Sequence, residues 1–237
     1  MTYRSYPGGI QMVQASSLMS DLHLEKGASY WSFKIERTAP YLILAGDIGQ
    51  LRHHEGHLAF LRAHCNIFER MFLVLGNHEF YGISRQEGIE YATRFEEELR
   101  EKLVVMNRTK QDIEDGNIVI LGCTLLPRIP EDTEGLTNDF QCIQQWCVSD
   151  HNEEYHKDLE WLKQSLEVVL RSKQRSRVII VTHYAPPFDQ TTHPTHRSSR
   201  NRYCFCSDTL TYLDTKVALE HVTHWIFGHT HYNGPPS

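Results

Sequence analysis

Five short segments of the sequence combine aspartate, asparagine and histidine, which are residue types that ligate divalent metal ions. In chain order the segments are Asp21-Leu22-His23, Gly46-Asp47, Gly76-Asn77-His78-Glu79, Thr182-His183-Tyr184 and Gly228-His229-Thr230-His231. Carboxylate and amide oxygens together with imidazole nitrogens, without thiolate, suit Mn²⁺, iron and Zn²⁺. Two ions bound side by side also need a carboxylate between them, because it offsets the repulsion of two dications. The set therefore predicts a centre for two divalent ions, each Mn, Fe or Zn.

Short apolar runs rich in β-formers recur along the chain, and metal-type residues follow several of them directly. The runs are Tyr41–Ala45, Met71–Leu75, Ile118–Leu121, Val178–Val181 and Trp225–Phe227. Runs of this length and composition are typical of buried strands. Because ligands gather at the carboxyl ends of strands in such sheets, we expect Asp47, Asn77 and His183 to converge at one edge.

Helical patterns lie between several of these runs. One covers Gln86–Lys102, and another covers Tyr155–Arg171, where apolar residues recur at steps of three and four. Strands that alternate with helices predict a layered α/β fold with a largely parallel inner part. Two proline-containing polar stretches, Pro127–Gly135 and Pro186–Asp208, are expected to be long loops.

Each metal-type segment alone also has an ordinary structural interpretation. Gly46-Asp47 is compatible with a turn after a strand, Asp21 with a helix N-cap and Gly76-Asn77 with a hairpin turn. Turn chemistry, however, does not require a histidine directly after a strand. The joint pattern therefore favours metal ligation over a series of unrelated turns.

The ordered set resembles the calcineurin-like metallophosphoesterases, whose pattern is D-x-H, G-D, G-N-H-[DE], H and G-H-x-H. The resemblance spans about residues 15 to 232 and is nearest to uncharacterised microbial members, which share Asn138-Asp139-Phe140 and Thr191-Thr192-His193-Pro194. It implies a calcineurin-like four-layer α/β/β/α sandwich with mixed sheets, formed as a single domain over residues 1–237. The chain stops six residues after His231, so we expect a truncated domain that lacks the C-terminal strands of its relatives and leaves a sheet edge uncovered.

The resemblance also implies a role for each candidate site residue. The first metal would be held by Asp21, His23 and His231, and the second by Asn77, His183 and His229. Asp47 would bridge the two ions, and a metal-bridging hydroxide would be the nucleophile. His78 would protonate the departing alkoxide or contact the phosphate, a task that suits imidazole because its unperturbed pKa is ~6.5.

The predicted activity is hydrolysis of phosphate monoesters or diesters. In many relatives an Asp three residues after the bridging Asp orients the catalytic histidine, and protein Ser/Thr phosphatases follow it with a phosphate-binding Arg. Here these positions are Gln50 and Leu51, which favours a small-molecule substrate over a phosphoprotein. The alternatives are a non-catalytic metal-binding scaffold of the same fold and a protein Ser/Thr phosphatase. The presence of His78 and of every ligand favours the enzyme.

A basic segment after the fourth motif could bind the phosphate of a substrate. Its candidate residues are His193, His196, Arg197, Arg200 and Arg202. Such side chains supply charge-assisted hydrogen bonds, although a solvated basic loop explains them equally well. In contrast, His53, His54 and His57 fit a polar loop that leads into a helix at Leu58–Leu61, so we do not expect them to bind metal.

Composition limits the remaining possibilities. The 237 residues fit one α/β domain, and a net charge of -6 without a long Lys/Arg run argues against general nucleic-acid binding. No apolar stretch approaches the ~20 residues of a membrane span, so we expect a soluble cytoplasmic protein without membrane association. Six scattered cysteines are expected to be reduced thiols. The polar run Gln14–Met19 predicts an irregular or displaced first strand.

Overall fold

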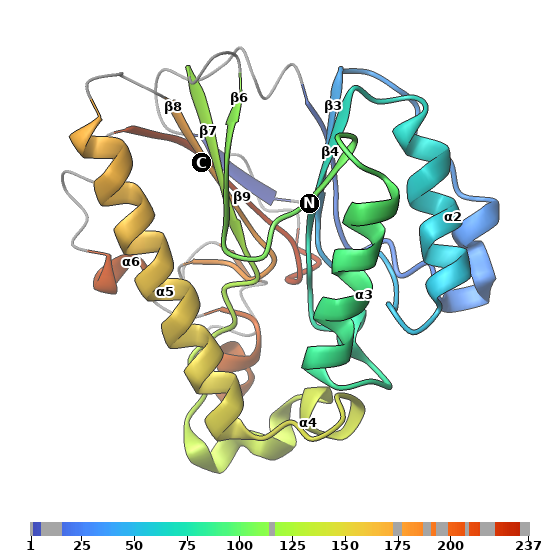
Figure 1. The fold of residues 1–237 in the computed structure, drawn as a ribbon. Coiled ribbons are helices and arrows are strands. Elements are labelled where there is room, and N and C mark those ends of the chain that lie inside the picture. The colour runs from blue at the N-terminus through green and yellow to red at the C-terminus, as the bar shows by residue number, and fades with distance from the viewer. Residues whose placement is uncertain are drawn as a thin grey trace.

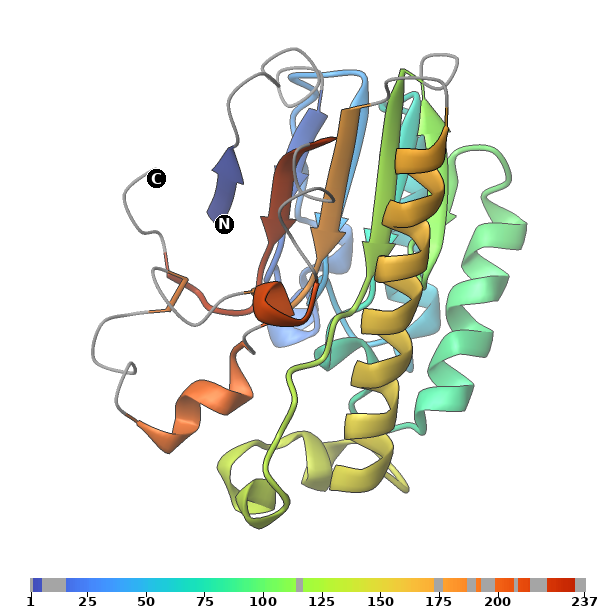
Figure 2. The same ribbon diagram turned by 90° about the vertical axis from the view of Figure 1, so that its left-hand side faces the viewer.

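The computed structural model of the chain describes residues 2–5, 16–113, 117–172, 177–186, 191–192, 199–206, 209–213 and 221–232. They form two β-sheets that pack face to face, with helices on the outer side of each sheet (Figure 1). Seen from the side in Figure 2, the sheets lie one behind the other between helical layers. The expected α/β/β/α architecture is confirmed.

The smaller sheet has four strands, and all neighbouring strands in it run parallel. Its order is β2 (Ser16–Met19), β3 (Tyr41–Ala45), β4 (Arg70–Val74) and β5 (Leu103–Val105). The connections β3 to β4 and β4 to β5 contain α2 (His54–Cys65) and α3 (Arg85–Glu98), as parallel pairing requires. A 3₁₀ helix, η1 (Lys26–Trp31), packs beside α2.

The first strand of this sheet is regular, so the expectation of an irregular strand is wrong. Residues 16–19 pair in parallel with β3 over the full strand length. Ser17 is buried, and its hydroxyl lies 2.9 Å from that of Thr38. Because this hydrogen bond satisfies a buried polar group, a polar residue is tolerated on the edge strand.

The larger sheet is mixed. Its order is β1 (Thr2–Ser5), β9 (Val222–Phe227), β8 (Arg177–Thr182), β7 (Ile118–Cys123) and β6 (Thr109–Ile113). The two outer pairs are antiparallel, whereas β7, β8 and β9 run parallel. No strand follows β9 in the described residues 228–232. The expectation that this edge is uncovered is nevertheless wrong, because β1 from the other end of the chain pairs with β9.

Strand alternation builds separate cores on the two faces of each sheet. In β3, Leu42 and Leu44 pack against the helices, whereas Ile43 and Ala45 pack against the other sheet. Because successive strand side chains point to opposite faces, a continuous apolar run is the pattern that a strand buried on both sides needs. The outer side of the larger sheet packs against α5 (Val148–Arg171).

The predicted helices occur close to their expected positions. The pattern at Gln86–Lys102 corresponds to α3, and the pattern at Tyr155–Arg171 is the C-terminal part of α5. Shorter helices are η2 (His78–Phe80), η3 (Glu131–Leu136), α4 (Asp139–Cys142), η5 (Arg200–Cys204) and α6 (Thr209–Tyr212). All six cysteines are free, as their spacing predicts. Within the described ranges, no helix is both long and apolar enough to cross a membrane.

Backbone hydrogen bonds tie the loops after the strands to one another across the sheets. The N–H of Asp21 donates to the carbonyl of Gly46 at 3.0 Å, and the N–H of Gly228 donates to the carbonyl of His183 at 3.0 Å. The hydroxyl of Thr124, directly after β7, donates to the carbonyl of Leu75 at 2.8 Å and so joins the larger sheet to the smaller one. The strand ends of both sheets therefore meet at one edge.

Candidate metal centre

All of the predicted metal-ligand residues lie at the edge where these strands end. Asp21 and His23 follow β2, Asp47 follows β3, Asn77 follows β4, His183 follows β8, and His229 and His231 follow β9. The ligand atoms of Asp21, His23 and His231 lie within 4.8 Å of one another, and so do those of Asp47, His183 and His229. Among the described residues, His23, Glu25 and His78 form a third such group. Asn77, which the resemblance assigns to the second ion, lies beside His183. The assignment of each residue to an ion stays a prediction.

The second cluster surrounds one imidazole nitrogen with other donors. Nε2 of His183 lies 3.3 Å from Oδ1 of Asp47, 3.2 Å from Oδ1 of Asn77 and 3.2 Å from Nδ1 of His229. One ring nitrogen carries at most one proton and cannot donate to all three neighbours. Nitrogen and oxygen atoms that converge in this way fit a divalent cation of the Mn, Fe or Zn type.

The first cluster is more open to solvent. Nε2 of His231 lies 3.4 Å from Oδ1 of Asp21 and 3.4 Å from Nε2 of His23. The His231 side chain is 58% exposed, whereas that of His23 is buried. Two imidazole nitrogens and a carboxylate that face each other also fit a divalent cation, here at a position that a ligand from solvent can reach.

Carbonyl groups orient two of the histidines. Nδ1 of His183 lies 2.9 Å from the carbonyl of Ala45, and Nε2 of His229 lies 3.0 Å from the carbonyl of Cys204. A ring N–H that donates to each carbonyl leaves the lone pair of the other nitrogen directed into the cluster. Metal-binding histidines commonly have such a partner, which selects the tautomer and the ring orientation.

The amide of Asn77 is oriented by a buried aspartate. Nδ2 of Asn77 donates to Oδ1 of Asp139 at 2.8 Å and to the hydroxyl of Tyr81 at 3.0 Å, so its oxygen faces His183. The Tyr81 hydroxyl also donates to Asp139 at 2.7 Å. Asn138-Asp139-Phe140 is part of the family resemblance, but the sequence pattern predicts no role for Asp139. Only the structure shows that it positions a candidate ligand from 62 residues further along the chain.

The carboxylate of Glu79 joins two ligand-bearing loops. Oε2 accepts from the N–H groups of Gly76 at 2.7 Å and Asp47 at 2.9 Å, and Oε1 accepts from Ile48 at 2.8 Å and Gly49 at 3.3 Å. Glu79 is fully buried. Burial and the neighbouring Asp47 raise the pKa of Glu79 to about 7, while the backbone donors favour the carboxylate. The acidic residue that ends the G-N-H-[DE] motif therefore fixes the loop after β3 as well as its own.

Five candidate ligands adopt a left-handed backbone conformation that is uncommon outside glycine. The φ angles are 55° for Asp21, 47° for His23, 55° for Asp47, 63° for His229 and 48° for His231. This conformation is unfavourable for a residue with a Cβ, and such strain is found mainly at functional sites. The sequence carries no direct signal for it, because the residues are not glycines.

His78 lies beside the two clusters and is held on several sides. Its Nδ1 lies 3.2 Å from Oε1 of Glu25, and its Nε2 lies 4.0 Å from Oδ2 of Asp47. The ring stacks on Tyr81 at 4.2 Å and meets the edge of His23 at 4.3 Å. The imidazole therefore presents Nε2 to the candidate centre while Glu25 holds its other nitrogen.

The carboxylate beside Nδ1 of His78 does not come from the position three residues after Asp47. At that position this chain has Gln50, whose Oε1 accepts from Nε of Arg52 at 2.7 Å. The carboxylate beside His78 comes instead from the loop after β2. The sequence pattern did not identify Glu25, although its position two residues after the D-x-H histidine was a possible signal.

The electrostatics of the second cluster favour a positive charge beside Asp47. Burial alone would lower the pKa of His183, but the Asp47 carboxylate outweighs burial and raises the pKa of His183 to about 10. In turn, burial would raise the pKa of Asp47, but His183 holds it well below its usual range. Burial and His183 lower the pKa of His229 to about 4. A divalent cation in this cluster would supply the positive charge that Asp47 requires.

The predicted substrate-binding segment is only partly described. His193, His196 and Arg197 lie outside the described residues, and Arg200 begins η5. Nη2 of Arg202 donates to the hydroxyl of Tyr203 at 2.9 Å, and its guanidinium carbon lies 4.9 Å from the centre of that ring. A phosphate-binding role for this segment stays a prediction.

The histidines at the start of α2 do not join the candidate clusters. Among the described residues, the groups with metal-binding geometry contain none of His53, His54 and His57. His57 is fully buried, its ring stacks on Tyr30 at 5.7 Å, and burial lowers its pKa to about 4. That these three histidines do not bind metal stays a prediction.

Known proteins resemble this chain in both sequence and structure. The family model described as calcineurin-like phosphoesterase matches residues 18–233. An uncharacterized protein, L509, of Acanthamoeba polyphaga mimivirus is 28% identical over 244 residues, which cover 90% of this chain and 83% of that protein. The crystal structure of phosphopantetheinyl hydrolase from Mycobacterium tuberculosis superposes with a TM-score of 0.61 at 18% identity, covering 92% of this chain and 84% of that chain. The structural likeness shows a shared fold.

We predict that Gly76→Ala removes the candidate metal centre. A Cβ at Gly76 would collide with Oδ1 of Asp47 and would lie 2.8 Å from Nε2 of His183, so both ligands would have to move. Elemental analysis of the purified variant should therefore show a loss of bound metal.

Gly135→Ala is the matched control, because a Cβ there would meet nothing within 4 Å. This variant should keep the metal content of the wild type. Equal metal content in Gly76→Ala and Gly135→Ala would show that the close packing around Gly76 does not shape the centre.

Proposed function

Because the chain belongs to the calcineurin-like phosphoesterase family, we propose that it is a dinuclear-metal-dependent hydrolase of small phosphate monoesters or diesters. The observation that carries the proposal is the pair of donor clusters, beside which His78 points Nε2 towards Asp47. Two metal ligand sets next to an imidazole are the parts that a phosphoryl displacement needs.

In this proposal the two clusters hold one divalent ion each. Asp21, His23 and His231 would ligate the first ion, Asn77, His183 and His229 would ligate the second, and Asp47 would bridge them. When bound, the ions would supply Lewis acidity and an activated water. Asp47 contacts a residue of each cluster. Its backbone carbonyl accepts from the N–H of His23 at 3.0 Å, and its Oδ1 lies 3.3 Å from Nε2 of His183. Asp47 is therefore suited to the position between the two ions.

His78 would act as the general acid. Its Nδ1 is held by Glu25, so a proton on Nε2 faces the centre and can pass to the departing oxygen. Burial by itself would lower the pKa of His78, but the hydrogen bond with Glu25 and the charge of Asp47 raise it. The protonated form that an acid requires is therefore favoured.

The surroundings of Gln50 and Leu51 support a small substrate. Leu51 is fully buried in the core between the smaller sheet and its helices, and Gln50 binds Arg52. Neither position offers the guanidinium with which protein phosphatases grip a phosphate dianion. Phosphate contacts would then depend on the ions and on the segment that contains His193, His196, Arg197, Arg200 and Arg202.

We predict that the wild-type protein contains about two divalent ions per chain and that Asp47→Asn weakens both together, since the bridging charge is lost. Elemental analysis after purification measures the metal content. An activity screen of phosphate esters with Mn²⁺, Fe²⁺ and Zn²⁺ measures turnover. Asp112→Asn, at an exposed surface ion pair with Lys110, is the control and should change neither.

Two ions per chain and normal turnover in Asp47→Asn would contradict the bridging role. A fully loaded wild-type protein that hydrolyses no phosphate ester would instead support the non-catalytic scaffold.

We predict that His78→Ala keeps its metal but loses ~10² to 10⁴ in kcat on alkyl phosphates, as is typical when a general acid is removed. Aryl phosphates should lose much less, because their leaving groups need no proton. Glu25→Gln, which removes the charge beside Nδ1 of both His78 and His23, should show the same preference for aryl esters with a smaller loss.

The measurement is kcat for ethyl phosphate and 4-nitrophenyl phosphate at saturating metal, with metal content checked for each variant. Equal losses on the two esters would argue against proton transfer and for phosphate binding by His78.

We predict that small esters are hydrolysed with a much higher kcat/KM than phosphoserine proteins. The bidentate partner that strengthens binding of a phosphoprotein dianion is missing at Leu51. Assays of both substrate classes with saturating metal test this directly, and a clear preference for phosphoproteins would refute it.

A further inference from the structure

Asp139 lies beside the candidate centre but is not one of the predicted ligands. It is 3% exposed, and the groups with metal-binding geometry in the described part of the chain do not contain it. It begins α4, which is held against the loop after β4: the N–H of Gly82 donates to the carbonyl of Cys142 at 2.7 Å, and the N–H of Gln144 donates to that of Ile83 at 3.0 Å. A buried carboxylate needs hydrogen-bond donors, so its partners indicate its role.

Three donors around the second cluster share this carboxylate. Oδ1 of Asp139 accepts from Nδ2 of Asn77 at 2.8 Å and from the hydroxyl of Tyr81 at 2.7 Å, and Oδ2 accepts from the hydroxyl of Tyr184 at 3.4 Å. The Tyr184 ring in turn packs against the His229 ring, with 4.1 Å between their centres. Asn77 and His229 are ligands proposed for the second ion, so the contacts of Asp139 lie on that side of the centre.

The carboxylate of Asp139 determines which end of the Asn77 amide faces the ion. A carboxylate only accepts hydrogen bonds, whereas an amide has a donor end and an acceptor end. Turning the amide around would place its oxygen against Oδ1 of Asp139 and would direct its NH₂ group, which is no metal ligand, towards the ion. The hydroxyl of Tyr81 donates its one proton to Asp139 and therefore presents only an acceptor to Asn77. Both partners thus keep the oxygen of Asn77 directed inward.

The ligands proposed for the first ion do not depend on this carboxylate. Within the part of the chain that the structure describes, Asp139 makes no hydrogen bond with Asp21, His23 or His231. Asp21 accepts instead from the N–H of His229 at 3.0 and 3.1 Å. Loss of Asp139 should therefore act on one ion, in contrast to loss of a bridging carboxylate.

We propose that Asp139 is a positioning residue that acts through Asn77 and strengthens the binding of the second metal ion but not of the first. The proposal rests on the dinuclear centre and the function proposed above. Removing the outer partner of a metal ligand typically lowers metal affinity ~10- to 100-fold, because the ligand is then no longer oriented before the ion binds.

The test measures the binding of Mn²⁺ to the full-length protein. The protein is dialysed against a series of Mn²⁺ concentrations, and elemental analysis gives the bound Mn²⁺ per chain and a dissociation constant for each site. Asp139→Ala should weaken one of the two sites ~10- to 100-fold and leave the other unchanged. Asp139→Ser, whose hydroxyl is one bond too short to reach Asn77 but keeps a polar group in the buried position, should give the same loss and serves if Asp139→Ala does not fold.

A double variant shows whether Asp139 acts through Asn77. Asn77→Ala should weaken the same site, and in that background Asp139→Ala should have no further effect, because the side chain that it positions is gone. If Asp139 acted on the ion through its charge, its removal would weaken the site in either background.

Glu154→Ala is the matched control for general loosening of the fold. Its carboxylate is also largely buried, with a side chain that is 13% exposed, and its partners Arg85, Arg108 and Lys157 are not candidate ligands. Glu154→Ala should change neither dissociation constant.

The outcomes separate this proposal from the function on which it rests. If the wild type binds about two Mn²⁺ per chain but Asp139→Ala and Asp139→Ser weaken neither site or both sites equally, the positioning role is overturned and the dinuclear centre stands. A further loss in the double variant overturns it as well. If the wild type does not bind two ions, the proposed dinuclear function fails and the role of Asp139 fails with it.

Discussion

The arrangement of the site depends on one buried carboxylate. Glu79 accepts hydrogen bonds from Gly76 and Asp47 on one oxygen and from Ile48 and Gly49 on the other. These donors belong to loops after two neighbouring parallel strands, which would otherwise bury backbone N–H groups without partners. A neutral amide, with one oxygen in place of two, could not accept from both pairs of donors. The proposed bridging residue is thus positioned by backbone hydrogen bonds before any ion is considered.

The left-handed backbone of the candidate ligands is stabilised by similar local contacts. Both carboxylate oxygens of Asp21 accept from the N–H of His229, at 3.0 and 3.1 Å, and so connect residues on different sheets. The N–H of His78 donates to Oδ1 of Asp47 at 3.0 Å. A strained conformation persists when several such bonds determine it, and here five of the nine described non-glycine residues with positive φ are candidate ligands. The two packed sheets supply the rigid frame for these bonds.

The sequence predicted the parts of the site that depend on residue type and on strand ends. Asp47, Asn77 and His183 each follow an apolar run, so their convergence follows from the geometry of a parallel sheet. The roles of Asp139 and Glu25 could not be predicted, because each acts on a residue from a different loop that only the folded chain brings near. The pairing of β1 with β9 was missed for another reason: Thr2–Ser5 is short and lacks a strand pattern.

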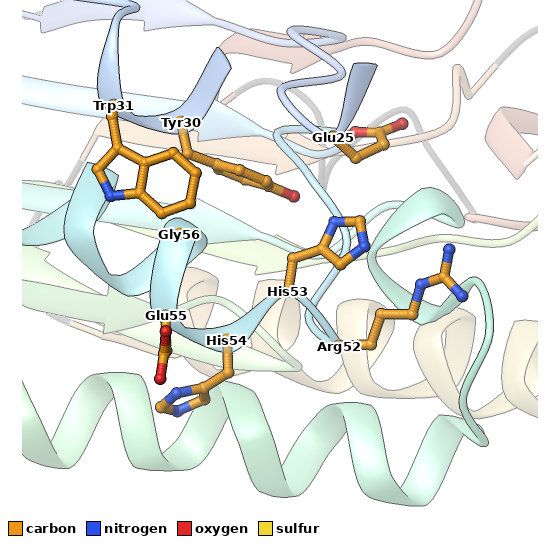
Figure 3. A pocket seen from close by; sticks show the side chains of 8 residues that line it. All are labelled: Glu25, Tyr30, Trp31, Arg52, His53, His54, Glu55 and Gly56. Carbon is orange, nitrogen blue, oxygen red and sulfur yellow. The ribbon is translucent and has the colours of Figure 1, made fainter. Parts of the chain in front are cut away.

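The position of Glu25 shows how one chemical requirement can be met from a different place in the chain. The carboxylate that holds Nδ1 of His78 comes from Glu25, directly before η1, rather than from a residue that follows β3. Gln50 is then free to bind Arg52, and its N–H donates to Tyr30. Both of these residues line a cavity of about 450 Å³ that Glu25 also lines (Figure 3). Glu25 therefore contacts both Nδ1 of His78 and a cavity whose other lining residues belong to η1, to the loop after β3 and to the start of α2.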